Sequence, residues 1–288
     1  MICLKASTAA GKTKREYIED VIDDCKLIFN AAFADQFFHD DNLKVAFCTS
    51  ADQASVFEEF CGKYFPLYLD EKHSRTDYFA AQAMTNVPEN ICGILICLDT
   101  PDEGEIWYQI ILHEMSHIFC ITNELDGENF YVKYSKVKMG DDPRYHFLYV
   151  GYAIWREFVA DYMASELNPF SETYSLTDLR KVVRQLDKNV NLDHPDRAQI
   201  YSQILVSVFQ NPRVAQAADA NDAVQILEKN RVFPPQNRRN YCATMELLFH
   251  QLDQESFWKL NVDFIEKLGE AYLKILFCET YSILEGLV

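Results

Sequence analysis

The chain has 288 residues, enough for one large domain or two modest ones with a substantial buried core. Its composition, 49% hydrophobic and 25% charged, is typical of a globular protein and argues against intrinsic disorder. Lys and Arg number 27 against 44 Asp and Glu, so the net charge is −17. Such a surface repels nucleic-acid phosphates and anionic membranes, and we expect neither as a partner.

The nine cysteines are odd in number and scattered along the chain. Most lie in apolar runs, such as Cys92 and Cys97 in ICGILICLD, as free cysteines do when they pack as small hydrophobic side chains in a reducing compartment. The N-terminus lacks an apolar segment of the signal-peptide kind, and no apolar run approaches membrane-spanning length. These features predict a soluble, cytoplasmic protein.

The first third of the chain alternates helix-like and strand-like segments. Apolar residues at helical spacing predict a helix from about Lys14 to Phe33, after a short apolar stretch in MICLK (1–5). The segment LKVAFCTS (43–50) then reads as a strand. Ser50 and Gln53 form a predicted capping box for the helix that follows.

A central helix is predicted after NICGILICLD (90–99), a continuous apolar run that is the strongest strand candidate. The start of this helix can be capped by residues of DTPDE (99–103), namely Thr100, Pro101 and Glu103. The helix contains IILHEMSHIFC (110–120). A second helix is predicted from about Leu148 to Leu167, before Asn168-Pro169. The polar segment between the two helices contains FYVKYSKV (130–137), whose alternation favours a hairpin.

The chain beyond Leu176 has no convincing strand signal. Periodic apolar stretches such as YCATMELLFHQL and FIEKLGEAYLKILFCETYSIL predict a helical bundle there. We therefore expect an α+β fold. A small sheet and a site-bearing helix would lie within residues 1–170, and an all-helical domain or extension within 171–288. This helical C-terminal region is a candidate for binding a protein partner.

His113, Glu114 and His117 form the pattern H-E-x-x-H on the predicted central helix. Positions i and i+4 lie one turn apart on one face of a helix, so both imidazoles can bind the same ion. Glu114 lies about 100° around the helix from His113, where it can touch a metal-bound water without binding the metal. In zincins, zinc lowers the pKa of such a water and the glutamate takes its proton. Alternatively, both histidines are ordinary core or surface residues.

A catalytic zinc also needs a third protein ligand and an open position for water. Glu157 in WREFVADYMASELNPF (155–170) is the better candidate. Asp161 lies one turn further along the same predicted helix face, where it can orient a ligating histidine. His146, in a segment rich in charged and turn residues that predicts a loop, is the competing ligand. Glu157 has a simpler interpretation as a solvated charge paired with Arg156.

HEMSHIF and EFVADYMASELNP together resemble the gluzincin metallopeptidases, in which a glutamate on a later helix is the third zinc ligand. The run E-x-x-A-D-x-x-A-x-E-L-x-P is most similar to the ImmA/IrrE-like peptidases. The resemblance implies a zincin-like domain, a peptide or protein substrate and one zinc ion per chain. It also implies these roles: zinc ligation by His113, His117 and Glu157, general base catalysis by Glu114, and a supporting position beside a ligand for Asp161.

Two features depart from the pattern of this family. The 40 residues from His117 to Glu157 exceed the usual spacing, so an insertion would lie within residues 122–146. Ser116 stands where the family commonly has glycine. The resemblance covers residues 40–170 and does not extend to the helical remainder.

ASTAAGKT (6–13) fits a looser form of the phosphate-binding loop, with Lys12 near the phosphates and Asp99 as a magnesium ligand. Thr13 and Glu16 offer the simpler interpretation of a capping box at the start of the first helix. A nucleotide-binding core also needs more parallel strand–helix units than this chain offers. The sequence therefore predicts a zinc peptidase. A non-catalytic zincin-like binding or regulatory module and a nucleotide-binding switch are the alternatives.

Overall fold

The computed structural model describes residues 13–33, 37–70, 80–99, 104–123, 143–170, 247–248, 250–251 and 254–276. In chain order the elements are α1 (Lys14–Phe33), β1 (Leu43–Cys48), α2 (Gln53–Tyr64), α3 (Leu67–Asp70), β2 (Ala81–Asn86), the 3-10 turn η1 (Val87–Glu89), β3 (Ile91–Cys97), α4 (Ile106–Thr122), α6 (Pro143–Leu167) and α12 (Val262–Leu276). This mixture of helices with a small sheet confirms the predicted α+β composition.

The chain divides into two compact units. The first consists of Met1–Thr122 with Met163–Ser171, and the second of Asn123–Tyr162 with Glu172–Val288. Helix α6 is continuous through Tyr162 and Met163, so its residues belong to both units. The domain boundary expected near residue 170 stays a prediction, because residues 171–246 lie outside the described part of the chain.

The sheet of the first unit has the strand order β1-β3-β2. The central strand β3 is parallel to β1 and antiparallel to β2, and all of its residues after Ile91 are buried. The predicted strands at 43–50 and 90–99 are thereby confirmed. The sequence does not signal β2, because AQAMTN mixes small and polar residues that have little intrinsic strand preference.

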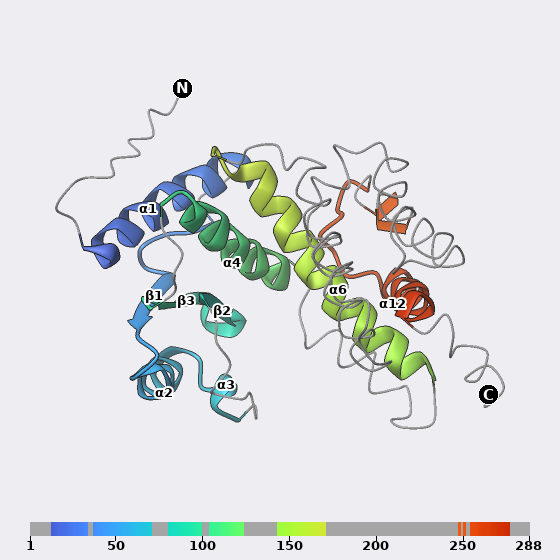
Figure 1. Cartoon of the computed structure of the whole chain (residues 1–288), viewed down its shortest axis with the longest axis horizontal. Helices are drawn as coiled ribbons and strands as arrows, with labels where there is room; N and C mark the ends of the chain where they lie inside the picture. Colours follow the sequence, from blue (N-terminus) through green and yellow to red (C-terminus); the bar gives the residue numbers. More distant parts are fainter. Residues whose placement is uncertain are drawn as a thin grey trace, which may run out of the picture. The chain divides into compact units, whose positions relative to one another are not determined.

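The two faces of this sheet are covered by different helices (Figure 1). Leu95 and Cys97 lie in a buried cluster with residues of α2, so alternation turns Ile94 and Ile96 to the opposite face. On that side lie α1 and α4 (Figure 1). Gly93 faces α2, where an added Cβ would lie 2.5 Å from the ring of Phe65. Burial on both faces explains why β3 reads as an unbroken apolar run.

The start of α1 confirms the predicted capping box. The backbone N–H of Thr13 donates to the Glu16 carboxylate at 2.7 Å, and the backbone N–H of Glu16 donates to the Thr13 hydroxyl at 3.3 Å. These two bonds satisfy donors that the first turn of a helix leaves without partners. The rest of the phosphate-loop candidate, residues 6–12, lies outside the described residues, as does the short segment 1–5.

The capping box predicted for α2 is wrong. Asp52, one residue before Gln53, occupies the N-cap position, and its side chain makes no capping hydrogen bond to the helix. The Asp52 carboxylate accepts hydrogen bonds from the backbone and hydroxyl of Thr49, at 2.6 and 2.7 Å. Ser50 instead donates its backbone N–H to Asp99 at 2.7 Å. The turn after β1 is therefore closed by Asp52 and by a contact from the next parallel strand, which local spacing does not reveal.

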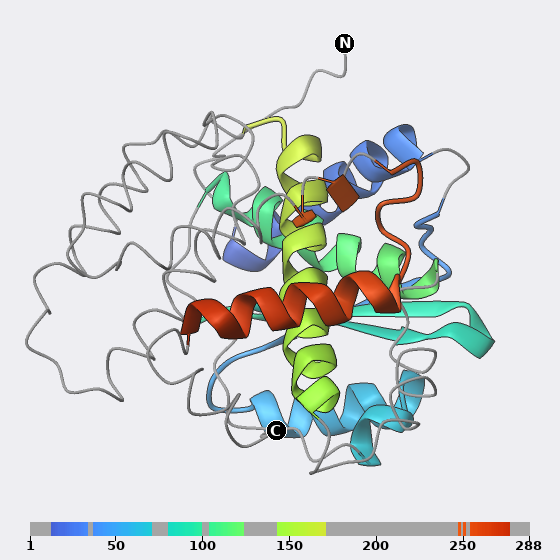
Figure 2. The ribbon, with the colours of Figure 1, turned by 90° about the vertical axis from the view of Figure 1, so that its right-hand side faces the viewer.

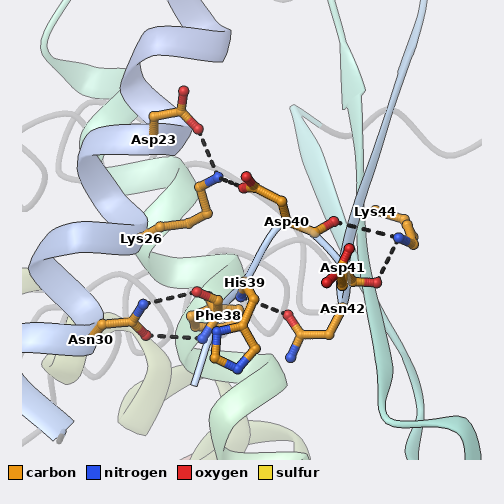
Figure 3. A network of polar contacts seen from close by, with 9 residues as sticks. All are labelled: Asp23, Lys26, Asn30, Phe38, His39, Asp40, Asp41, Asn42 and Lys44. Carbon is orange, nitrogen blue, oxygen red and sulfur yellow. Dashed lines mark hydrogen bonds and ion pairs between the residues drawn. The ribbon is translucent and has the colours of Figure 1, made fainter. Parts of the chain in front are cut away.

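A polar network joins α1 to the segment before β1 (Figure 3). The side chain of Asn30 donates to the carbonyl of Phe38 at 2.8 Å and accepts from its N–H at 2.9 Å. Lys26 forms ion pairs with Asp23 at 2.8 Å and Asp40 at 2.6 Å. The hydrogen bond from Lys26 holds the pKa of the Asp40 carboxyl below its ordinary value. The network ties the entry of β1 to α1.

Helix α4, which carries the H-E-x-x-H pattern, confirms the predicted central helix and packs against α1. The hydroxyl of Tyr108 donates to Asp24 at 2.6 Å, and burial together with this carboxylate raises the pKa of Tyr108. Near the other end of α4, the ring of Phe119 lies 5.5 Å from that of Phe29 and 4.6 Å from that of Phe33. Both ends of α4 are therefore fixed to α1.

In the second unit, α12 crosses α6 (Figure 2). A Cβ added to Gly151 would overlap the carbonyl oxygen of Ile265, and one added to Gly269 would overlap that of Phe147. The crossing therefore needs glycine on both helices. Trp155 of α6 is fully buried next to this crossing.

Helix α6 begins at Pro143, five residues before the predicted start, and ends at Leu167 as predicted. Pro143 suits the first helical position, because that residue needs no backbone N–H donor. Past residue 170 the described segments are helical or turn-like and contain no strand, and α12 confirms the predicted helix as far as Leu276. The hairpin expected at 130–137 and the cap expected at 100–103 lie outside the described ranges.

Within the described part of the chain, the cysteines are free and buried, as expected for cysteines that act as small hydrophobic residues: Cys25, Cys48, Cys61, Cys92, Cys97 and Cys120. Burial raises the pKa of the Cys48 and Cys92 thiols to about 12 and that of Cys61 to about 11. These thiols are therefore protonated at neutral pH and are poor nucleophiles. Across the described ranges, no helix has the length and apolar character needed to cross a membrane.

Candidate metal centre

His113 and His117 meet on one side of α4, as their spacing predicts. Their Nε2 atoms are 2.9 Å apart, and the two rings are nearly perpendicular, with an interplanar angle of 88°. His117 is buried and His113 is half-buried. At this distance one ring donates a hydrogen bond to the other, and a metal ion bound to both Nε2 atoms would take the place of the shared proton.

The helix that carries these histidines is held by an apolar surface. Trp107, Ile111 and Met115 are fully buried. Ser116 is buried as well, and its hydroxyl donates to the carbonyl of Leu112 at 2.7 Å. Serine thus occupies the position where the resembled family commonly has glycine without leaving its hydroxyl unsatisfied.

Glu114 contacts the sheet. Its Oε2 accepts a hydrogen bond of 2.7 Å from the backbone N–H of Ala83 on β2. Ala83 is on the edge strand β2. The Cys97 N–H donates to the carbonyl of Ala80, so the backbone groups of Ala80 and of every second residue after it face β3. By alternation, the N–H of Ala83 points away from β3. The carboxylate is therefore oriented by the open edge of the sheet.

The next outward N–H along β2 is also bound by a side chain. Thr85 donates its backbone N–H to the hydroxyl of Tyr68 at 3.2 Å. Two successive outward donors of the edge strand are therefore satisfied by side chains, Glu114 from α4 and Tyr68 from α3. Such pairing protects an edge strand from aligning with another strand.

Glu157, the predicted third ligand, lies close to the two histidines. A ring nitrogen from each histidine and a carboxylate oxygen of Glu157 all lie within 4.8 Å of one another. Among the described residues, no other set of three His, Cys, Asp or Glu side chains meets this criterion. Arg156 also binds Glu157, with its two nitrogens 2.8 and 3.1 Å from Oε1. The ion pair of the simpler interpretation is thus present beside the metal-ligand grouping.

The C-terminal end of α6 packs against α4 within the first unit. The Cys120 and Met163 sulfurs are 3.7 Å apart. The Gln109 side chain donates to the Ser165 hydroxyl at 3.5 Å and accepts from the Asn168 side chain at 3.2 Å. Glu157 lies six residues before Met163 on the same unbroken helix.

The chemistry and spacing of this donor set fit zinc. Zinc binds imidazole nitrogen and carboxylate oxygen, and catalytic sites use three protein ligands with one open position. Bonds of about 2.0 to 2.2 Å at tetrahedral angles place ligand atoms about 3.3 to 3.6 Å apart. The 2.9 Å between the histidine nitrogens and the 4.8 Å limit of the whole group lie on either side of this range.

Asp161 and His146, the two other site candidates, both lie on α6. Asp161 is half-buried one turn after Glu157, and its hydrogen bond to a histidine stays a prediction. The loop predicted for His146 is wrong, because α6 begins at Pro143. His146 thus lies three turns, about 16 Å, along the helix from Glu157. That separation favours Glu157 as the ligand that shares the site with the histidines.

Gln109, Ser165 and Asn168 join α4 to the end of α6 and were not predicted from the sequence. A signal for two of them was present, since Gln109 lies four residues before His113 and Ser165 four residues after Asp161. That spacing puts each on the same helix face as the neighbouring site residue. Ala83 had no such signal, because its role depends on the sheet edge.

Comparison with known proteins finds no matching family model, no similar curated protein and no similar solved structure. The resemblance to gluzincins therefore rests on the two quoted motifs alone. The mixed α and β composition is a property of the structure, whereas a zincin-like identity stays a hypothesis.

Proposed function

We propose that the chain is a zinc-dependent peptidase of the gluzincin type, most similar to the ImmA/IrrE-like peptidases. The observation that carries this proposal is the grouping of His113, His117 and Glu157 within 4.8 Å, with Glu114 on the same helix as the histidines. The grouping unites two sequence motifs that lie 40 residues apart between His117 and Glu157.

The architecture around the site supports a zincin-like domain. Helix α4 lies against a small sheet whose edge strand β2 contacts Glu114. In the proposed assignment, His113, His117 and Glu157 hold one zinc ion per chain, and Asp161 orients one of the histidines. The substrate is a peptide or protein, and the proposed location is the cytoplasm.

In the proposed reaction, zinc supplies Lewis acidity, which polarises a peptide carbonyl and makes water easier to deprotonate. Glu114 takes a proton from the attacking water and later delivers it to the leaving amine. The hydrogen bond from Ala83 keeps the Glu114 carboxylate in one orientation through Oε2. A carboxylate held in this way needs little reorganisation during proton transfer, and positioning of this kind lowers the barrier.

A non-catalytic zinc-binding or regulatory module is the second candidate, and the Arg156–Glu157 ion pair is the observation that favours it. An arginine at a ligand carboxylate lowers the negative charge available to the metal. The nucleotide-binding alternative receives less support. Thr13 and Glu16 form the cap expected of an ordinary helix start, and Asp99 accepts a hydrogen bond from Ser50.

The proposal is tested first by metal content. Protein purified without added zinc should contain about one zinc ion per chain by elemental mass spectrometry. A His113→Ala, His117→Ala double variant should contain none, while Lys12→Ala serves as a control outside the site. Equal zinc content in the wild type and the double variant would reject the metal site.

Turnover is tested separately, by incubating the zinc-loaded protein with a broad peptide library and with cell lysate analysed by proteomics. We expect cleavage that a chelator abolishes and added zinc restores. Zinc binding without any cleavage would favour the regulatory module over the peptidase.

A further inference from the structure

Polar side chains follow the site face of both helices beyond the proposed metal ligands. On α4, Gln109 precedes His113 by one turn, and His117 follows by one turn. On α6, Ser165 lies two turns after Glu157, and Asn168 directly follows the last residue of the helix. Residues spaced by three, four, seven or eight positions share one broad face of a helix. The proposed ligands and this polar group therefore belong to one continuous row on each helix.

The contacts between α4 and the end of α6 show that the two helices run in opposite directions there. Asn168, beyond the last turn of α6, contacts Gln109 near the start of α4. Met163, earlier on α6, contacts Cys120 near the end of α4. Moving back along α6 from Asn168 to Met163 therefore means moving forward along α4 from Gln109 to Cys120.

Gln109, Ser165 and Asn168, which we term the amide clamp, join the two rows by specific hydrogen bonds. The Gln109 side chain uses its nitrogen toward Ser165 and its oxygen toward Asn168, at 3.5 and 3.2 Å. Asn168 also accepts the backbone N–H of Phe170 at 3.0 Å, which fixes the orientation of its amide. Ser165 is buried, with 8% of its surface exposed. An amide bonded on both sides resists sliding of one helix along the other.

We propose that the amide clamp is a positioning device for the metal centre, with Gln109 and Asn168 as positioning residues. This inference rests on the proposed zinc site. The two histidines come from one helix and need no partner to stay together, whereas Glu157 reaches them only through the placement of α6. Glu157 lies on the same continuous helix as Ser165, so we expect a change in how the end of α6 is held to reach it.

Zinc ligation tolerates little displacement of the third ligand. Ligand distances hold within about 0.2 Å of their preferred values, so a helix shift of a fraction of a turn removes the carboxylate from the ion. The amide clamp contains no His, Cys, Asp or Glu side chain that would replace the Glu157 carboxylate as a ligand. Loss of the clamp is therefore expected to change the coordination of the metal and not only the stability of the fold.

The test uses the full chain and cobalt(II) as a spectroscopic substitute for zinc. Wild type, Gln109→Ala, Asn168→Ala and their double variant are titrated with Co²⁺, and zinc affinity is measured by competition with a chromophoric chelator. Thr122→Val is the matched control, since its hydroxyl bonds the carbonyl of Ile118 in the same helix. We expect each clamp variant to lose about 10- to 100-fold in zinc affinity, as supporting residues of metal sites typically do.

The cobalt spectrum separates positioning from simple stabilisation. In the clamp variants, the visible absorption should shift toward that of a Glu157→Ala variant, while Thr122→Val keeps the wild-type spectrum and affinity. Suppose that Gln109→Ala and Asn168→Ala keep the wild-type affinity and spectrum while the His113→Ala, His117→Ala variant binds no metal. That result would overturn the positioning role but not the proposed metal site. If Asn168→Ala fails to fold, Gln109→Ala alone decides the test. A wild-type chain that binds neither cobalt nor zinc overturns both this role and the proposed metal site.

Discussion

The Oε2 of Glu114 lies 2.7 Å from the backbone nitrogen of Ala83, so the proposed general base is bound to the edge strand of the sheet. This bond joins α4 and β2, residues 31 positions apart, and it orients a carboxylate beside the two histidines.

Replacing Glu114 by glutamine should remove hydrolysis while leaving zinc in place. The amide oxygen of glutamine can still accept the N–H of Ala83, but the side chain no longer accepts a proton from water. We expect at least a hundredfold loss of peptide cleavage, in line with the typical contribution of general base catalysis. Zinc content and cleavage rate are measured together, and Glu59→Gln on the exposed side of α2 is the control. Chelator-sensitive cleavage at the wild-type rate in Glu114→Gln would refute the assignment.

Glu157 and Asp161 should differ in the severity of their loss. Glu157 is a proposed direct ligand, and its removal leaves two histidines that hold zinc weakly. Glu157→Ala should therefore be purified nearly free of zinc. Asp161→Ala should keep the ion with about 10- to 100-fold lower affinity or activity, because it only orients a ligand. Zinc affinities are measured by chelator competition, with Glu166→Ala, an exposed site on the same helix, as the control. Full zinc binding in Glu157→Ala would point to another third ligand.

Gly269→Ala should destabilise the protein through the crossing of α6 and α12. The added methyl group would overlap the backbone carbonyl of Phe147, and backbone cannot move aside as a flexible side chain can. Overpacking of this kind costs about 1–3 kcal/mol, or more where backbone must shift. Gly62→Ala in α2 is the matched control, since the nearest atom would lie 3.9 Å away. Because alanine favours a helix more than glycine does, Gly62→Ala should raise the free energy of unfolding by about 0.5–1 kcal/mol. Denaturant unfolding measures both, and equal midpoints would contradict the close crossing.

The buried thiols should make stability fall at alkaline pH. Burial holds the pKa of Cys48 and Cys92 near 12 and that of Cys61 near 11, against an ordinary value of 9.0. Between these values the unfolded chain releases protons that the native chain keeps, so the free energy of unfolding decreases as pH rises. At pH 8, alkylation of these three cysteines should be slow until denaturant is added. Peptide mapping after a short iodoacetamide pulse measures this, and rapid native labelling would contradict the burial.

Local features were predictable because neighbouring residues determine them. The capping box of Thr13 and Glu16, the helix that presents His113 and His117 on one side, and the apolar strand 91–97 each depend on spacing within a few turns or on a single run. The end of α6 at Leu167 followed in the same way from Asn168-Pro169. A continuous α6 from Pro143 was not foreseen, because the preceding segment is rich in turn residues.

By itself, then, the sequence determined that His113 and His117 lie on one face of a helix and predicted that they bind a metal, because helical geometry converts sequence spacing directly into direction. Only the tertiary structure decided which distant groups meet. The bond between Ala83 and Glu114 depends on the strand order that leaves β2 at an edge, and the contact of Gln109 with Asn168 depends on how α6 returns to α4. These contacts result from packing of the whole chain, because burial of apolar surface, and not separation in sequence, determines which residues become neighbours.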